Sequence, residues 1–559
     1  MAVEQHTFPG ALVDTFYRMP DRMALALLDN ERPARHVTYR DLLLHATGYA
    51  QALASHLILP GEVVILILQH GLDLVCAFCG AALHGAVPSI MPFLTEKLDP
   101  EQYRHSLKSL FEITRPAVVI TYPEFVAEAR QAAEDSSVRL VLTCDQVTPA
   151  DSFNPGLLAG LECSPQDILL LQHSSGTTGL QKGVALSHQA VFNQLAAYAE
   201  ALHLQPEDVV VSWLPLYHDM GLIAGFLLPL LERIPLVLLS PFDWVRAPYR
   251  LLQAVSEYRG TLSWLPNFAF NFCAQKIRPR DLQGVDLSSW RAVSNCSEPM
   301  HSHSHQVFLE RFRPYGLRPS ALTTCYAMAE NVFAVTQGGI DAPVRVDTVN
   351  QAVLIARGLA EPVPAGHEQA ISLLSAGQPI PNTQVQIVDK KHRLLPERQI
   401  GEIALRSDCM LSGYYHRPDL TRQAFHDGWY QTGDLGYMVE GEVFVTGRKK
   451  DLIIVGGKNI YPQDLERLAG EVPGIHPGRA VAFGIYNDQS GTEDVALVAE
   501  SDLDEEEYLR LEDAVRQQVN RGSDVVLRYV RVVGRGWLLK TSSGKIARSA
   551  NRDKYLAEN

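Results

Sequence analysis

Residues 167–201 read DILLLQHSSGTTGLQKGVALSHQAVFNQLAAYAEA, which joins an apolar strand pattern, a loop rich in glycine and hydroxyl residues, and a helical pattern. Glycines let the backbone approach an anion closely, and hydroxyl groups and a lysine cation can bind phosphate oxygens. The loop therefore predicts a phosphate-binding site. Its candidate contacts are Ser174, Ser175, Gly176, Thr177, Thr178, Gly179 and Lys182.

The order of residues in this loop does not fit the phosphate loop of P-loop ATPases. That motif places a glycine immediately before the lysine and a hydroxyl residue after it. Here Gln181 precedes Lys182 and Gly183 follows it. A flexible Gly/Ser connection without a ligand is the alternative for the loop considered by itself.

Apolar runs along the first 240 residues predict the fold. Four of them are short and almost wholly apolar: residues 63–68, 117–121, 168–171 and 209–213. Such runs are typical of parallel strands that helices cover on both faces. Helical patterns at residues 39–56 and 187–201 have lengths suited to crossover connections. We therefore expect an α/β chain with parallel sheets.

Two breaks in this alternation divide the chain. Residues 338–373 are rich in Gly, Pro and Ala, and we expect an insertion or an exposed arm there. Near residues 448–451 a strand pattern, EVFVTG, meets a new run of β-α-β signals that continues to the end. The sequence thus predicts a large N-terminal domain of parallel and mixed sheets flanked by helices, residues 1–448, and a smaller α+β domain, residues 449–559.

Composition argues against several other classes of protein. The formal net charge is −14 and no basic run stands out, which disfavours a nucleic-acid partner. Eight scattered cysteines are too sparse for a disulfide framework, and Cys76 and Cys79 lie in an apolar helical segment that is typical of core. The longest mostly apolar stretch, residues 220–231, is too short to span a bilayer, and the first residues lack a secretory pattern. We expect a cytoplasmic protein with no membrane span.

Six motifs occur in a single order along the chain: SSGTTGLQKG (174–183), WLPLYHDMG (213–221), YAMAE (326–330), YQTGD (430–434), GRKKD (447–451) and SGK (543–545). This order resembles that of the acyl-adenylate-forming ligase superfamily, which contains acyl-CoA synthetases, adenylation domains of peptide synthetases, luciferases and fatty acyl-AMP ligases. The chain is most similar to the fatty acyl-AMP ligases. Four segments resemble the sequence motifs of that group: LPLYHDMGL (214–222), PNFA (266–269), NCSEP (295–299) and KNIYPQD (458–464). Residues 338–373 lie where that group has its characteristic insertion.

The resemblance implies ATP and Mg²⁺ and assigns residues to each. Lys182 and the phosphate loop hold the β- and γ-phosphates, and Glu330 is the carboxylate for Mg²⁺. Tyr326 stacks on adenine, Asp434 accepts the two ribose hydroxyls, and Arg448 lies at the second ribose contact. The segment that flanks the adenine contains Asn295, Cys296, Ser297 and Ala327, and this chain departs from the family there, with glycine usual at 327 and glycine-alanine at 296 and 297.

The resemblance also assigns the catalytic residues. Lys545 lies in a Gly/Ser turn, TSSGKIAR, from which its ammonium can reach both a carboxylate and the α-phosphate, where negative charges are forced together. His218 is placed near the reacting carboxylate and the acyl tunnel. Lys450 marks a hinge about which the C-terminal domain swings, and Gly456 and Gly457 suit a loop that approaches a pantetheine arm.

Each assignment has a plainer alternative. Glu330 is then a helix N-terminal acid, Asp434 a turn residue, Tyr326 a core residue and His218 a structural histidine. A His218–Asp219 dyad is rejected, because neighbours in sequence seldom point the same way. His301, His303 and His305 are predicted to lie at a solvated helix start rather than on a metal, because alternate positions share a face only on a strand.

The chemistry itself asks for these residue types. A carboxylate is a poor electrophile, and attack on the α-phosphorus of ATP converts it into a mixed anhydride with AMP and releases pyrophosphate. The implied function is activation of a carboxylic acid, most simply a fatty acid, and transfer to the phosphopantetheine of a separate acyl carrier protein. An acyl-CoA synthetase is the nearest alternative, and a non-catalytic nucleotide-binding protein is a remote one. Acyl chain length, an aryl or branched acid, and the oligomeric state stay open.

Overall fold

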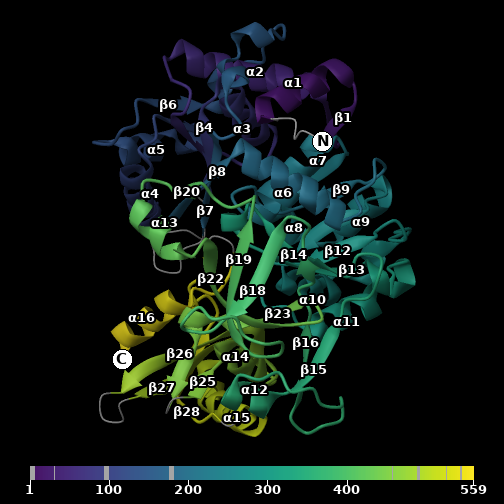
Figure 1. Ribbon diagram of the computed structural model, residues 1–559, viewed down its shortest axis with the longest axis vertical. Helices are drawn as coiled ribbons and strands as arrows, with labels where there is room; N and C mark the ends of the chain where they lie inside the picture. The colour runs from purple at the N-terminus through teal and green to yellow at the C-terminus, as the bar shows by residue number, and fades with distance from the viewer. Residues whose placement is uncertain are drawn as a thin grey trace.

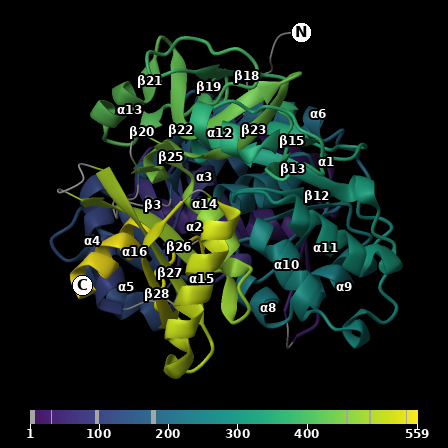
Figure 2. The same cartoon turned by 90° about the horizontal axis from the view of Figure 1, so that it is seen from below.

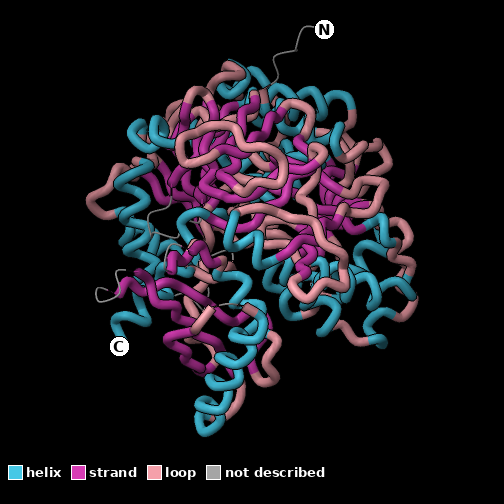
Figure 3. The backbone as a smooth tube through the Cα atoms, turned by 60° about the horizontal axis from the view of Figure 1, so that its bottom comes forward, coloured by secondary structure: helices cyan, strands magenta, loops and turns pink. Residues whose placement is uncertain are grey.

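The chain forms a large N-terminal domain and a smaller C-terminal domain, which lies at the bottom of Figure 1. This computed structural model describes residues 7–29, 32–93, 100–174, 182–455, 458–487, 492–523, 525–541 and 544–559. Helices run along the strands of both domains (Figure 3). The predicted fold class, α/β with a smaller second domain, is confirmed.

A nine-stranded mixed sheet forms the centre of the N-terminal domain. Its order is β17 (Gln378–Pro379), β14 (Ala334–Gly338), β13 (Leu322–Ala327), β12 (Ala292–Asn295), β11 (Leu262–Leu265), β9 (Val210–Ser212), β10 (Leu236–Leu239), β1 (Met23–Leu28) and β2 (Arg35–Thr38). The six strands from β13 to β1 run parallel, and the outer ones pair antiparallel. Parallel strands start at one edge and all end at the other, so the residues that follow them gather along one edge.

Most of the helices of this domain pack around that sheet and the neighbouring ones. They are α1 (Phe8–Arg18), α2 (Tyr39–Ser55), α3 (Leu72–His84), α6 (His188–Ala201), α7 (Leu228–Leu231), α8 (Pro241–Arg246), α9 (Tyr249–Tyr258), α10 (Asn267–Lys276) and α11 (Ser302–Phe312). The predicted helices at 39–56 and 187–201 are thus α2 and α6. A capping box between Thr38 and Asp41 begins α2.

Cys76 and Cys79 lie in α3, where both side chains are buried in the main apolar core. Burial raises the pKa of both thiols, which keeps them protonated and unreactive. The prediction that this pair is core is confirmed. No helix in the described part of the chain combines the length and the apolar character that a bilayer crossing needs.

A second, wholly parallel sheet has the order β4 (Val87–Ile90), β3 (Val63–Ile67), β5 (Val118–Thr121) and β6 (Leu140–Thr143), with α4 (Pro100–Thr114) and α5 (Val126–Ala133) beside it. Every residue of β3 and β5 is buried, as the apolar runs predicted. The run at 168–171 behaves differently. It forms β7 (Ile168–Ser174), which pairs antiparallel with β8 (Lys182–Ser187), and β8 pairs with β20 (Gly413–Tyr414). The expectation of a parallel strand there is wrong, because a hairpin and not a crossover follows β7.

A third sheet closes the N-terminal domain on the side of the C-terminal domain. It contains β18 (Thr383–Val388), β19 (Gly401–Ser407), β22 (Trp429–Val439), β21 (Phe425–His426) and β23 (Glu442–Arg448), and α13 (Pro418–Ala424) lies beside it. Residues 338–373 contribute a hairpin of β15 (Val346–Asn350) and β16 (Ala370–Leu374) with α12 (Gln351–Arg357) between the strands.

Part of this segment packs against the N-terminal domain, whereas residues 361–362 and 364–369 are exposed. Val349 and Leu354 pack in an apolar cluster with Tyr437 of β22. Asp347 accepts a hydrogen bond of 2.8 Å from the Tyr437 hydroxyl and forms an ion pair of 2.9 Å with Arg398. The composition of the segment concealed these contacts, because they join it to residues that lie more than forty positions further along.

The C-terminal domain is built on the sheet β26 (Ile475–Asn487), β27 (Thr492–Ser501) and β28 (Leu527–Gly534). It also contains β24 (Ile453–Val455), β25 (Lys458–Ile460), α14 (Pro462–Gly470), α15 (Tyr508–Gly522) and α16 (Arg548–Glu558). Separate apolar clusters cover the two faces of the sheet, one with α14 and α15 and the other with α16. Seen from below, this domain lies in front of the larger one (Figure 2).

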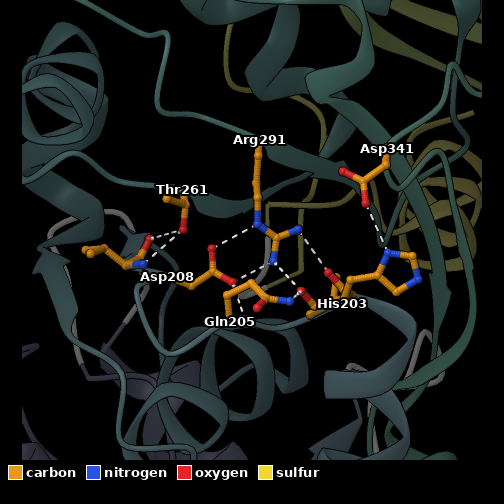
Figure 4. A network of polar contacts seen from close by, with 8 residues as sticks. His203, Gln205, Asp208, Thr261, Arg291 and Asp341 are labelled. Carbon is orange, nitrogen blue, oxygen red and sulfur yellow. Dashed lines mark hydrogen bonds and ion pairs between the residues drawn. The ribbon is translucent and has the colours of Figure 1, made fainter.

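Arg291 ties together three segments at the start of the parallel strands (Figure 4). Its guanidinium contacts the Asp208 carboxylate at 2.6 and 2.9 Å and donates to the carbonyls of Leu202 and His203. The side chains are 18% and 3% exposed, so this ion pair is largely shielded from solvent. Burial pushes the pKa of Asp208 upward, but the hydrogen bonds from Arg291 and the Gln205 N–H hold it below its ordinary value.

Replacing Arg291 by Met should lower the free energy of unfolding at pH 7 by about 3 kcal/mol, because the Asp208 carboxylate stays buried without its cation. Since the pKa of Asp208 is depressed in the folded state, the loss should shrink as the pH falls toward 3. Urea unfolding measures both. Arg278→Met is the control, because Arg278 is 59% exposed and solvent screens its ion pair with Asp281. Equal losses in the two variants would contradict this assignment.

Candidate active site

The predicted site residues gather where the parallel strands end. Segments that follow β9, β12 and β13 carry His218, Ser297 and Glu330, and these strands belong to the same sheet with β11 between β9 and β12. The connectivity therefore brings together motifs that lie more than a hundred residues apart in sequence.

Tyr326, Asp434 and Arg448 form one connected group. The Tyr326 hydroxyl donates to Asp434 Oδ2 at 2.6 Å, and Arg448 Nε lies 3.1 Å from Asp434 Oδ1. Asp434 and Arg448 face each other in the register of β22 and β23. Burial, followed by the charge of Asp434, raises the pKa of Tyr326, so its hydroxyl remains a donor. An aromatic face, a carboxylate and a guanidinium thus lie together, as recognition of a base and a ribose requires.

Glu330 and Lys182 are connected through a tyrosine that the motifs did not single out. Glu330 lies in the short turn η9 (Ala329–Asn331) after β13, and its Oε1 accepts a hydrogen bond of 2.9 Å from Tyr414. The Lys182 ammonium lies 4.8 Å from the centre of the Tyr414 ring, and the hydroxyls of Tyr414 and Tyr430 are 2.9 Å apart. Tyr414 therefore contacts the Glu330 carboxylate through its hydroxyl and the Lys182 ammonium through its ring face.

The backbone next to Glu330 is strained. Val332 has a φ of +61°, a conformation that β-branched residues rarely adopt. Such strain persists only where the surroundings enforce it. Here the Glu330 carbonyl accepts the Leu411 N–H at 2.8 Å, and Asn331 is fully buried. The turn that presents Glu330 is thereby fixed.

His218 lies in the segment after β9, between Tyr217 and Asp219. Burial, followed by the charge of Lys545, lowers the pKa of His218 to about 3, so the imidazole is neutral at physiological pH. Its Nε2 is buried and has no hydrogen-bond partner in the described part of the chain. The Asp219 carboxylate accepts the Met220 N–H at 2.8 Å instead of pairing with the imidazole, which agrees with the rejection of a dyad.

The residues predicted to flank a base occupy the ends of two neighbouring strands. Asn295 ends β12 and Ala327 ends β13, and the Asn295 amide donates to Asn267 Oδ1 at 3.0 Å. Cys296 is fully buried, so its side chain belongs to the core. Ser297 has a φ of +70°, and its hydroxyl lies 3.7 Å from the Met220 sulfur. Of these residues, Ser297 and Ala327 are the half-buried ones.

Part of the predicted phosphate loop lies outside the described residues. This applies to Ser175, Gly176, Thr177, Thr178 and Gly179, and likewise to Gly456 and Gly457 of the expected pantetheine loop. Ser174 ends β7, where it pairs in register with Lys182, the first residue of β8. The two ends of the loop are thus brought side by side by the hairpin, close to Glu330.

Lys545 of the C-terminal domain lies within electrostatic range of this edge. Its charge lowers the pKa values of His218, Asp219 and Glu298, all of which belong to the N-terminal domain. The Lys545 N–H donates to the Thr541 hydroxyl at 3.2 Å, which fixes the backbone at the lysine.

Lys450 lies in the short turn η10 (Lys449–Asp451) between the domains. The residues immediately before and after Lys450 form ion pairs with different domains. Lys449 forms an ion pair of 2.7 Å with Glu402 of the N-terminal domain, whereas Asp451 pairs at 2.9 Å with Arg548 of the C-terminal domain. The connection thus passes from one domain to the other within about three residues.

The histidines at 301, 303 and 305 do not share one environment. They lie at the start of α11, as predicted, and His303 is exposed. His305 is instead buried, stacked on Phe270 and 3.1 Å from the Asn295 amide nitrogen. The expectation of a solvated helix start is wrong for His305, because one turn of helix directs it into the core.

Comparison with known proteins identifies the family. Residues 13–415 match the family of AMP-binding enzymes. The long-chain-fatty-acid–AMP ligase FadD26 of Mycobacterium bovis is 30% identical over 100% of this chain and 98% of its own length. The medium-chain-fatty-acid–[acyl-carrier-protein] ligase JamA of Moorena producens is 30% identical over 96% of this chain and 92% of its own length.

A solved structure, reported in a study of fatty acyl-adenylate ligases from E. coli and L. pneumophila, superimposes with a TM-score of 0.90 and 28% identity and covers 99% of this chain and 98% of that one. The fold, the ordered motifs and these relatives agree. The chain is an enzyme that belongs to the AMP-binding family, and its resemblance to the fatty acyl-AMP ligases is confirmed.

Proposed function

We propose that this enzyme joins a fatty acid to the AMP moiety of ATP, releases pyrophosphate, and passes the acyl group to the phosphopantetheine thiol of a separate acyl carrier protein. The observation that supports the proposal most is that Lys545 of the C-terminal domain lies within electrostatic range of His218 and Asp219, which follow β9 in the sheet whose strand β13 leads to Glu330. The names of the relatives, which include fatty-acid–AMP and acyl-carrier-protein ligases, favour this substrate and this acceptor.

In the first half-reaction a carboxylate oxygen of the acid forms a bond to the α-phosphorus, and the bond from that phosphorus to the bridging oxygen of pyrophosphate breaks. Two anions have to approach each other, so a cation at their meeting point lowers the barrier. Lys545 is the group proposed for this task. The neutral His218 beside it adds no charge, and its unpaired Nε2 suits contact with the carboxyl group.

Binding of the nucleotide is assigned to the connected tyrosine, aspartate and arginine. The face of Tyr326 is proposed to stack on adenine, while Asp434 accepts the ribose hydroxyls and Arg448 supports that contact. Asn295, Cys296, Ser297 and Ala327 border the base. Lys182 and the loop from Ser174 to Gly179 are assigned to the β- and γ-phosphates.

A Mg²⁺ ion fits the carboxylate of Glu330. In the described part of the chain no three His, Cys, Asp or Glu side chains converge on a metal position. Mg²⁺ is commonly held by one or two carboxylates together with substrate phosphates, so a single glutamate is sufficient. When bound, the ion would neutralise charge on the phosphates.

In the second half-reaction the thiol sulfur attacks the acyl carbon, the thiol proton is lost, and AMP leaves. Lys545 has no part in this step. We propose that the domain from residue 449 to 559 turns about Lys450 to admit the thiol, with residues 1–448 as the fixed domain. The short connection between the ion pairs of Lys449 and Asp451 supports a hinge at this point.

The insertion is the feature that bears on whether the acyl group passes to a carrier protein or to CoA. Gln351 of α12 faces the Asp464 carboxyl of α14, so the insertion touches the C-terminal domain as well as β22. A domain restrained in this way is slow to open for a small free thiol, whereas a carrier protein contributes docking contacts of its own. CoA transfer is the alternative that shares the same first step.

Lys545→Ala should abolish pyrophosphate exchange, by at least about a hundredfold, because the cation at the meeting point of two anions is lost. Thioester formation from supplied acyl-AMP should remain within about twofold of the wild type. Lys554→Ala, on the same domain but seated on the Trp537 ring, is the matched control. Equal loss of both half-reactions would refute the role given to Lys545, and absence of acid-dependent pyrophosphate release in the wild type would refute the proposed function.

Holo-carrier protein and CoA, offered side by side at equal concentration, should give acyl-carrier as the predominant thioester. Asp347→Asn weakens the contacts of the insertion with Arg398 and Tyr437 and should therefore raise acyl-CoA formation relative to the wild type. Mass spectrometry of the two thioesters measures the ratio. Rapid acyl-CoA release by the wild type would establish the alternative function instead.

The contact between Asp464 and Gln351 should depend on pH. Burial raises the pKa of Asp464 to about 6, against the smaller lowering by Arg467. A carboxyl whose pKa is raised on folding adds stability at low pH and loses it as the pH rises through 6. Asp464→Asn should therefore raise the melting temperature most at pH 8, less at pH 5, and have little effect below the unfolded-state pKa of 3.8. Asp513→Asn, on the exposed side of α15, should show no such difference.

A further inference from the structure

Gly447, the residue before the end of β23, lies directly against the C-terminal domain. Any side chain at this position would place its Cβ 2.6 Å from the amide nitrogen of Gln463 and 3.0 Å from Cδ1 of the Tyr461 ring. Glycine permits so close an approach of the backbone because it has no Cβ. The two domains thus meet here in a contact that is matched to their present arrangement.

A hydrogen bond between the domains accompanies this close approach. Thr446 is the extra residue of a bulge, because Gly447 and Val445 on either side of it face consecutive residues of β22. A bulged residue is left out of the ladder, and here the Gln463 side-chain amide donates to the Thr446 carbonyl. Tyr461, beside this hydrogen bond, is 4% exposed. The contact is therefore partly shielded from solvent.

The helix α14, which follows Tyr461, is fixed both within the C-terminal domain and to the residue after the hinge. Its apolar side chains pack in the core of that domain. Arg548 of α16 pairs at 2.5 Å with Glu466 of α14 and at 2.9 Å with Asp451, and each of these side chains is 18% exposed. A rotation about the hinge therefore carries α14 with it, so the contact with β23 has to break.

We propose that this contact is a latch that holds the C-terminal domain in the arrangement described here, and that it opens between the two half-reactions. The latch comprises Gln463 and Tyr461 on the C-terminal domain with Thr446 and Gly447 on the N-terminal domain. Its link to adenylation rests on the proposed function, in which Lys545 is the cation for that step and lies within electrostatic range of the sheet edge in this arrangement.

Gln463 is a positioning residue, because it acts through the place of the C-terminal domain and touches no reacting atom. The neighbouring ribose contact does not depend on it. Arg448 faces Asp434 in the register of β22 and β23 and lies 3.1 Å from its carboxylate, and both residues belong to the N-terminal domain. Loss of the latch should therefore lower the kcat of adenylation and leave the KM for ATP within about twofold.

The arrangement of the domains can be measured apart from activity. Spin-labelled noncanonical residues at Leu394 and Leu509, which are 71% and 76% exposed on different domains, give the distribution of distances between the domains. Gln463→Met removes the donor and keeps the length of the side chain. The ratio of the wild-type distance to longer or shorter ones should fall about fivefold, the usual contribution of one hydrogen bond. Gln518→Met, whose amide bonds to Glu471 within the C-terminal domain, should match the wild type.

Activity provides the second measurement, with a saturated fatty acid that supports pyrophosphate release by the wild type. In Gln463→Met the kcat of pyrophosphate exchange should fall in proportion to the population at the wild-type distance. Thioester formation from supplied acyl-AMP should stay within about twofold. Gly447→Ala should lower that population and the exchange rate further, because its Cβ excludes the close approach. The double variant should be no worse than Gly447→Ala, since both changes act on one contact.

Each result decides between the latch and the proposed function. An unchanged distance distribution in both single variants would overturn the inference and leave the proposed function intact. A shifted distribution with wild-type exchange, an equal fall of both half-reactions, or a raised KM for ATP with unchanged kcat would also overturn it. Absence of acid-dependent pyrophosphate release in the wild type would instead refute the proposed function, and the shift in distances would still be expected.

Discussion

Repulsion between anions is the constraint on which the rest of this structure depends. A carboxylate and a triphosphate meet only where positive charge is concentrated. In the proposed function the N-terminal domain supplies Lys182 and Arg448 to the site, while Lys545 comes from the C-terminal domain. Around them, burial keeps His218 neutral and the Tyr326 hydroxyl protonated, so no further negative charge is added. The division of cations between two domains links the chemistry to domain movement.

The sequence predicted what is local. Apolar runs gave β3 and β5 because parallel strands are buried on both faces, and the pattern of α2 gave its bounds to within a residue. The order of the motifs predicted the family, because a motif is recognised from residue identities alone. The fold class followed from the alternation of the two patterns, without any contact between distant residues having to be known.

What escaped prediction depends on long-range pairing. Tyr414 lies outside the recognised motifs, yet it contacts both Glu330 and Lys182. Glu330 precedes it by 84 positions, and Lys182 lies still earlier in the chain. The predicted direction of β7 was wrong, because an apolar run looks the same in a parallel and in an antiparallel strand. Only the hairpin to β8 decides between the two. The contacts of the insertion could not be foreseen either, because Asp347 meets Tyr437 and Arg398 only in the folded chain.

The character of the contact between the domains follows from the need to reverse it. Each apolar cluster in the described residues lies wholly within one domain: the clusters of the N-terminal domain end at Phe444 and Val445, and those of the C-terminal domain begin at Ile453. Polar contacts do cross, such as that of Asp464 with Gln351 and the hydrogen bond that the Gln463 amide donates to the Thr446 carbonyl. A shared apolar core would hold the domains together by about 25 cal/mol for every Å² buried, and breaking it on each turnover would be slow. Polar contacts regain water when they open, so in the proposed function they can hold the domains together for one half-reaction and release them for the next. A closed arrangement held in this way stays weak enough to open.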